Sequence, residues 1–141
     1  ENRDVADRDF RNDKVDAGEI GAGHNVTALY EVELTGEQAP LATVRIRAKA
    51  PNGTEAAEQS FAFDQRMLRA SVEAASSDFR FALAVAATAD ILRQSPNARK
   101  WSLVTARKLA EGAIAGQTER KEFVALVTQA QALMGASATR R

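Results

Sequence analysis

The feature that most constrains the fold is the stretch of residues 15–34, which reads VDAGEIGAGHNVTALYEVEL. Its second half alternates as a half-buried β-strand does, because every second residue from Val26 to Leu34 is apolar or aromatic and two glutamates lie between them. We therefore expect a strand over residues 26–34. Such a strand sets a register that the later strands have to match.

The first half of this stretch is a loop that contains three glycines. Gly18, Gly21 and Gly23 permit positive φ angles, and we expect them to shape a turn that enters the sheet. A phosphate-binding loop does not fit, because it needs a Lys-Ser/Thr pair or has to connect a strand to a helix. His24 ends the loop, and we expect it to be a surface hydrogen-bonding group. A metal site formed with Asp16 and Glu19 is the alternative.

Two further strands are predicted over residues 41–49 and 58–63, separated by a Pro-Asn-Gly-Thr turn. The first of them places Val44 and Ile46 on its inner side and Arg45 and Arg47 on its outer side. We expect the arginines to form a solvated face that pairs with acidic residues of strand 26–34. The alternative is a stripe that binds anions.

The second half of the chain is rich in alanine and predicts three helices, over residues 78–94, 98–115 and 118–134. Gly116 is expected to follow the second helix, and Gly135 to end the third. The packing anchors that we predict are aromatic: Tyr30 in the sheet, and Phe81, Trp101 and Phe123 in the helices. For Trp101, a ligand-stacking patch beside Arg99 and Lys100 is the alternative.

These elements predict an α+β fold, in which a small antiparallel β-sheet from the N-terminal half packs with a three-helix cluster from the C-terminal half. We expect an extended lead-in over residues 1–14 and a sheet part over 15–64. The helical part of the same module covers 65–135, and residues 136–141 form a tail. Because the chain begins at Glu1 in a charged run, we read it as part of a longer protein.

Composition excludes several classes of function. The 19 basic residues equal the 19 acidic ones, which argues against a nucleic-acid-binding protein. The absence of cysteine excludes disulfides, thiolate metal sites and a cysteine nucleophile. No apolar run approaches the roughly 20 residues that span a bilayer.

No catalytic constellation is evident, so we predict neither an enzyme nor a cofactor. With a single histidine, nucleophile and base pairs reduce to serines around His24, and none of the serines lies in a Gly-x-Ser-x-Gly turn. Two alternatives remain. One is a small-ligand or anion-binding domain that uses His24, Arg45 and Arg47, and the other is a hydrolase that uses scattered carboxylates.

Three separated segments carry a family resemblance: residues 1–34, the run SSDFRFALAVAATADILRQS, and the run RKEFVALVTQAQAL. Together they resemble the region that follows the von Willebrand factor type A domain in a family of bacterial cell-envelope proteins. In that family this region is a domain of unknown function. The A domain carries a metal-dependent adhesion site built on Asp-x-Ser-x-Ser, a motif that these 141 residues lack.

The resemblance implies a non-catalytic structural and interaction module, located outside the cytoplasm in the cell envelope. Its partners would be the upstream A domain of the same chain and a further protein that the sequence does not identify. A three-stranded sheet has two open edges, so self-association through a sheet edge is a further expectation.

Overall fold

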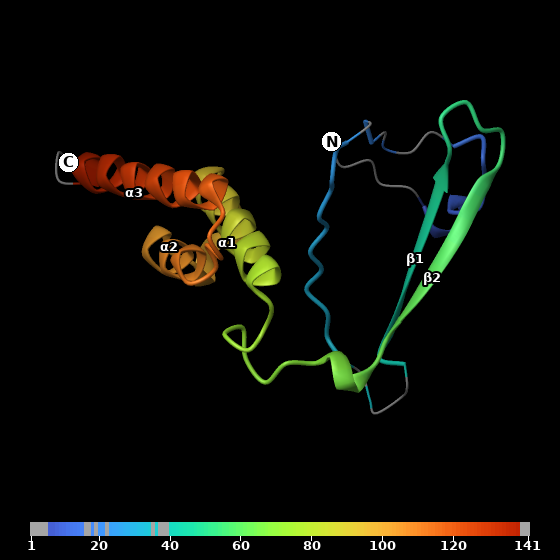
Figure 1. Cartoon of the computed structure of the whole chain (residues 1–141), viewed down its shortest axis with the longest axis horizontal. Helices are drawn as coiled ribbons and strands as arrows, with labels where there is room; N and C mark the ends of the chain where they lie inside the picture. Colours follow the sequence, from blue (N-terminus) through green and yellow to red (C-terminus); the bar gives the residue numbers. More distant parts are fainter. Residues whose placement is uncertain are drawn as a thin grey trace. The chain divides into compact units, whose positions relative to one another are not determined.

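The computed structural model describes residues 6–15, 18, 20–21, 23–34, 36 and 40–138 (Figure 1). The chain divides into two compact units, Glu1–Leu68 and Arg69–Arg141. A two-stranded antiparallel sheet lies in the first unit, and three α-helices lie in the second. This arrangement confirms the α+β class.

The sheet is a hairpin of β1 (Ala42–Lys49) and β2 (Ala56–Phe63). The connecting turn is closed by a 2.8 Å hydrogen bond from the Gly53 N–H to the Ala50 carbonyl, and Asn52 takes a positive φ of 61° within it. The register places Val44 opposite Phe61 on one face and Arg47 opposite Glu58 on the other. The hairpin therefore has one apolar and one charged face.

The strand predicted over residues 26–34 is wrong, because β1 and β2 are the only strands among the described residues. Side chains of this segment are exposed, with Val26 at 71% and Val32 at 64%. Alternation supplies two faces, but a strand also needs a ladder of backbone hydrogen bonds. The short turn lets β1 and β2 form that ladder at low loop-closure cost.

The helical unit contains α1 (Ser77–Leu92), the 3₁₀ turn η3 (Pro96–Lys100), α2 (Leu103–Glu111) and α3 (Thr118–Ala138). Shorter 3₁₀ turns, η1 (Asp7–Asp9) and η2 (Gln65–Met67), lie in the first unit. The single helix expected over residues 98–115 is thus divided. Ser102 is extended and caps α2 by accepting a 3.1 Å hydrogen bond from the Thr105 N–H, while the Thr105 hydroxyl accepts one from the Ser102 N–H.

The helix end expected at Gly135 is also wrong, since α3 continues to Ala138. A glycine stops a helix where it adopts a left-handed conformation, and Gly135 does not do so. Gly116 does, with a φ of +79°, in the connection between α2 and α3. The C-cap of α2 itself is Gly112.

The core of the helical unit is built largely of small side chains. Its buried apolar residues are Ala84, Ala87, Leu103, Ala106, Ala110, Ala113 and Val127. Small residues let helices approach closely, and α2 packs against both α1 and α3. Part of the apolar stripe of α3 remains at the surface, with Leu126 at 62% and Leu133 at 70% exposure.

Candidate functional site

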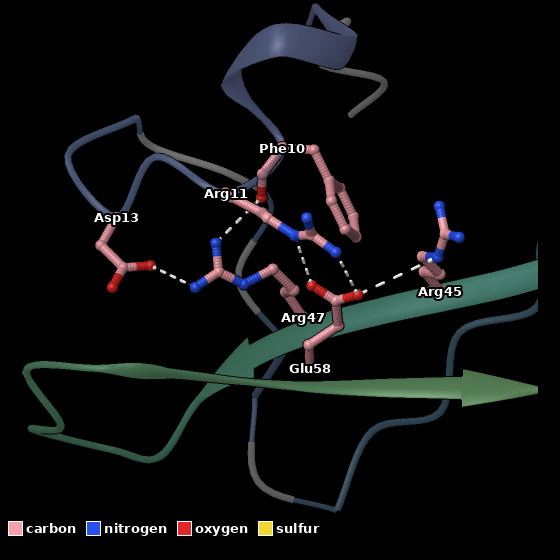
Figure 2. Close-up of polar contacts among 6 residues, drawn as sticks. All are labelled: Phe10, Arg11, Asp13, Arg45, Arg47 and Glu58. Atoms are coloured by element: carbon pink, nitrogen blue, oxygen red, sulfur yellow. Dashed lines mark hydrogen bonds and ion pairs between the residues drawn. The ribbon is translucent and has the colours of Figure 1, made fainter.

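The segment of residues 10–13 lies against the charged face of the hairpin (Figure 2). Arg11 forms a two-pronged contact with Glu58 of β2: its Nε donates to Oε2 at 2.9 Å, and a terminal nitrogen donates to Oε1 at 3.1 Å. Arg45 of β1 approaches the same carboxylate at 4.0 Å. The parallel geometry of an arginine and a carboxylate gives this contact direction as well as attraction.

Arg47 makes the second link between β1 and this segment. Its guanidinium donates to the Phe10 carbonyl at 3.2 Å and to the Asp13 carboxylate at 3.0 Å. The Lys49 ammonium donates to the Asp13 carbonyl at 2.7 Å. Residues 10–13 are therefore held across the strand by side chains at alternate positions, although the sequence predicts an extended lead-in there.

The pKa values reflect the same contacts. The hydrogen bond from Arg11 is the main reason that the pKa of Glu58 lies below its ordinary value, and the charges of Arg45 and Arg47 act in the same direction. The Glu58 carboxylate in turn raises the pKa of Arg11. Glu58 is thus the ionised centre of this cluster.

In the structure, the predicted ligand residues His24, Arg45 and Arg47 do not come together in one cluster. The two arginines face Glu58 and Asp13, whereas the backbone N–H of His24 donates to the Gly21 carbonyl at 3.0 Å. Sequence reasoning missed Arg11, Asp13 and Glu58. The sequence feature that could have identified Glu58 is the Pro-Asn-Gly turn, because the register of the hairpin around this turn places Glu58 opposite Arg47.

The opposite face of the hairpin is apolar and exposed. Val44 is 48% exposed, Ile46 51% and Phe61 51%. The sequence predicted that the first two would face inward. An exposed apolar face of this kind is suited to pack against another protein surface.

In the helical unit, Phe81 and Phe123 form an edge-to-face pair with ring centroids 5.3 Å apart. The Arg120 guanidinium lies over the Phe81 ring at 4.7 Å, and it donates to the Ala113 carbonyl at 2.7 Å and to the Asp78 carboxylate. Sequence reasoning missed Arg120. The sequence feature that could have identified Arg120 is its position three residues before Phe123, which places both on the same side of α3.

The remaining predicted residues take varied positions. Tyr30 is 81% exposed, so the packing role expected of it is not seen in the part of the chain that the structure describes. Trp101 is half-buried and lines a groove of the helical unit. Among the loop glycines, Gly23 has a φ of +78° and Gly18 has open space around it. Gly21 lies against the His24 ring, where an added Cβ would come within 2.9 Å of Nδ1.

The described residues contain no group of three or more acidic or histidine side chains placed to hold a metal ion. Asp16 and Glu19 lie outside those residues, so the alternative metal site at His24 stays a prediction. None of the helices that the structure describes is long and apolar enough to cross a membrane.

Comparisons with protein families and with individual proteins lead to the same family. The family described as "Uncharacterized protein YfbK, C-terminal" matches residues 1–41 and 34–133. The chain is 32% identical over 149 aligned residues to the "Uncharacterized protein YfbK" of Escherichia coli (strain K12). That match covers 90% of this chain and 25% of the relative, so the chain spans a quarter of the relative's length. No solved structure matches.

Proposed function

Because the chain belongs to the family of YfbK C-terminal domains, we propose that it is a non-catalytic structural and interaction module. In this proposal it follows a von Willebrand factor type A domain in a bacterial cell-envelope protein and supports protein–protein contact there. The resemblance of three separated segments supports this context. The length of the relative leaves room for the further domain that the proposal needs.

The observation that carries the proposal is the exposed apolar face of the hairpin. Val44, Ile46 and Phe61 are each about half exposed and lie together, since Val44 pairs with Phe61 and Ile46 lies two residues further along β1. Burying this face against a partner removes apolar area from water, at about 25 cal/mol for each Å². We propose that the partner is the preceding domain of the same protein.

The edges of the hairpin provide a second means of contact. Among the described residues, β1 and β2 pair only with each other, so each strand has an outer edge whose backbone groups can accept a further strand. Addition of a strand by the preceding domain would extend the sheet, and the remainder of that domain could then pack over the apolar face. A second copy of this chain is the competing occupant.

The anion-binding alternative receives less support from the contacts that Arg45 and Arg47 make. Arg47 already donates to Phe10 and Asp13, and Arg45 lies beside Glu58, so the chain's own carboxylates face these cations. A ligand at this stripe would have to displace them. We therefore place the interaction surface on the opposite, apolar face.

The test uses the full-length protein, divided into this chain and the preceding part. Ile46→Asp introduces a charge into the apolar face, whereas Thr43→Asp introduces the same charge at an exposed position on the charged face of β1. We expect Ile46→Asp to abolish binding of the preceding part in titration calorimetry and Thr43→Asp to leave it unchanged. Circular dichroism verifies that both variants are folded.

Two results would count against the proposal. One is binding that Ile46→Asp does not weaken, and the other is a chain that associates only with itself in light scattering. Loss of self-association in Ile46→Asp, with no binding of the preceding part by either form, would assign the face to a homodimer instead.

A further inference from the structure

A groove in the helical unit combines cationic and apolar groups in a way that the proposed function does not use. Its volume is 390 Å³, within the range of pockets that bind small molecules. Residues that line it include Val72, Arg80, Trp101, Lys108, Leu109 and Gly112. All of them belong to the unit Arg69–Arg141, so the groove is formed within one compact body.

Arg80 of α1 contributes a guanidinium group to the lining of the groove. Its Nε is buried and has no hydrogen-bond acceptor among the described residues, as is also true of the Nε atoms of Arg47 and Arg107. Because the buried Nε cannot be reached from the groove, a ligand would contact the terminal nitrogens of Arg80, one of which lies beside the groove-lining Gly112. The guanidinium group presents parallel N–H donors, which match the two oxygens of a carboxylate.

Two further charges complete the electrostatics of the groove. Lys108 of α2 contributes a second cation to the lining, and Glu73 contributes one carboxylate. Glu73 is held ionised, because a hydrogen bond from its own backbone and one from Ser71 lower its pKa, and the Arg80 charge adds to this effect. One positive charge remains in excess, which favours an anionic ligand.

Apart from Thr105, the rest of the lining is apolar. Trp101, Val72 and Leu109 offer an aromatic ring and two aliphatic side chains. Gly112 has no side chain at a point where a Cβ would lie 3.6 Å from a terminal nitrogen of Arg80. Space for a ligand atom therefore exists directly beside the positive charge.

We propose that this groove binds a small organic carboxylate with an apolar body. The carboxylate accepts hydrogen bonds from Arg80 and lies near Lys108, and the apolar body packs against Trp101. This inference does not depend on the proposed function, which uses the hairpin of the other unit.

The test compares phenylacetate with its uncharged counterpart, phenylacetamide, on the whole chain. Trp101 is the only tryptophan, so its fluorescence reports binding in the groove directly. We expect phenylacetate to bind about tenfold more tightly than phenylacetamide, or better. Arg80→Met should remove this preference, whereas the matched variant Arg99→Met, which changes an arginine outside the groove lining, should keep it.

Two other variants keep the proposal testable if Arg80→Met does not fold. Lys108→Gln should reduce the preference for phenylacetate several-fold. Gly112→Ala should weaken both ligands by filling space, and its φ of −68° suits alanine. Equal affinity for the two ligands, or no response of fluorescence or amide NMR shifts at millimolar phenylacetate, would overturn the proposal.

Discussion

Arg120 is the side chain whose removal should reveal most about how the helical unit holds together. It is only 8% exposed, although arginine is rarely buried without a partner. From α3 it reaches the Ala113 carbonyl in the α2–α3 connection, the Asp78 carboxylate in the first turn of α1, and the Phe81 ring. We predict that Arg120→Met destabilises the helical unit by about 2–4 kcal/mol.

This magnitude combines the loss of three contacts with one compensating gain. Loss of the charged donor to the carbonyl of the fully buried Ala113 costs about 1.5–3 kcal/mol. Loss of the cation–π contact with Phe81 costs about 0.5–2 kcal/mol. The Asp78 side chain is 80% exposed, so its pairing contributes only about 0–1 kcal/mol, and burial of the methionine side chain offsets part of the total.

Urea unfolding of the whole chain, followed by Trp101 fluorescence, measures this loss in the helical unit itself. Lys121→Met is the matched control, because Lys121 is the next residue of α3 and is exposed, and its replacement should change stability by less than about 0.5 kcal/mol. Arg120→Lys keeps the charge without the planar donors and should fall between the two. A stability of Arg120→Met equal to that of Lys121→Met would refute the reasoning.

Three further predictions follow from single contacts. The lowered pKa of Glu58 means that its pairing with Arg11 stabilises the folded state at neutral pH and is lost as the pH falls through that pKa. The NMR shift of the Arg11 Nε–H, which donates to Glu58, should therefore titrate in acid in the parent chain and lose this response in Glu58→Gln. Ser102→Ala removes the N-cap of α2 and should cost about 0.5–2 kcal/mol in urea unfolding. Val127→Ala, at a position 1% exposed, should cost about 1.5–3 kcal/mol, whereas Leu126→Ala, at 62% exposure, should cost much less in the same assay.

Local patterns in the sequence predicted the two strands of the hairpin and the helix α1 well. The Pro-Asn-Gly turn and the alternation on both sides of it act over a few residues, and β1 and β2 lie within two residues of their expected ends. The cap of α1 is local as well, because Ser76 directly precedes the helix and its hydroxyl accepts a hydrogen bond from the Phe79 N–H. Signals of this range need no knowledge of distant segments.

The candidate site was harder to predict, because its contacts join residues far apart in the chain. Arg11 and Glu58 are 47 positions apart, and Arg120 and Asp78 are 42 apart. The chain has 19 basic and 19 acidic residues, and nothing in the local sequence distinguishes these four side chains from the others. Periodicity also favoured a strand over residues 26–34, although no local signal states whether a partner strand is available.

The sequence by itself therefore determined the class of the fold, the two strands of the hairpin with the turn between them, and the absence of cysteine chemistry. These follow from backbone preferences and side-chain periodicity, which act between near neighbours. Only the tertiary structure decided which face of the hairpin residues 10–13 contact, which arginines are paired, and that Arg80 and Lys108 line the same groove as Trp101. Those outcomes depend on which distant groups meet, and pairing of a buried charge is decided by the groups that surround it in space.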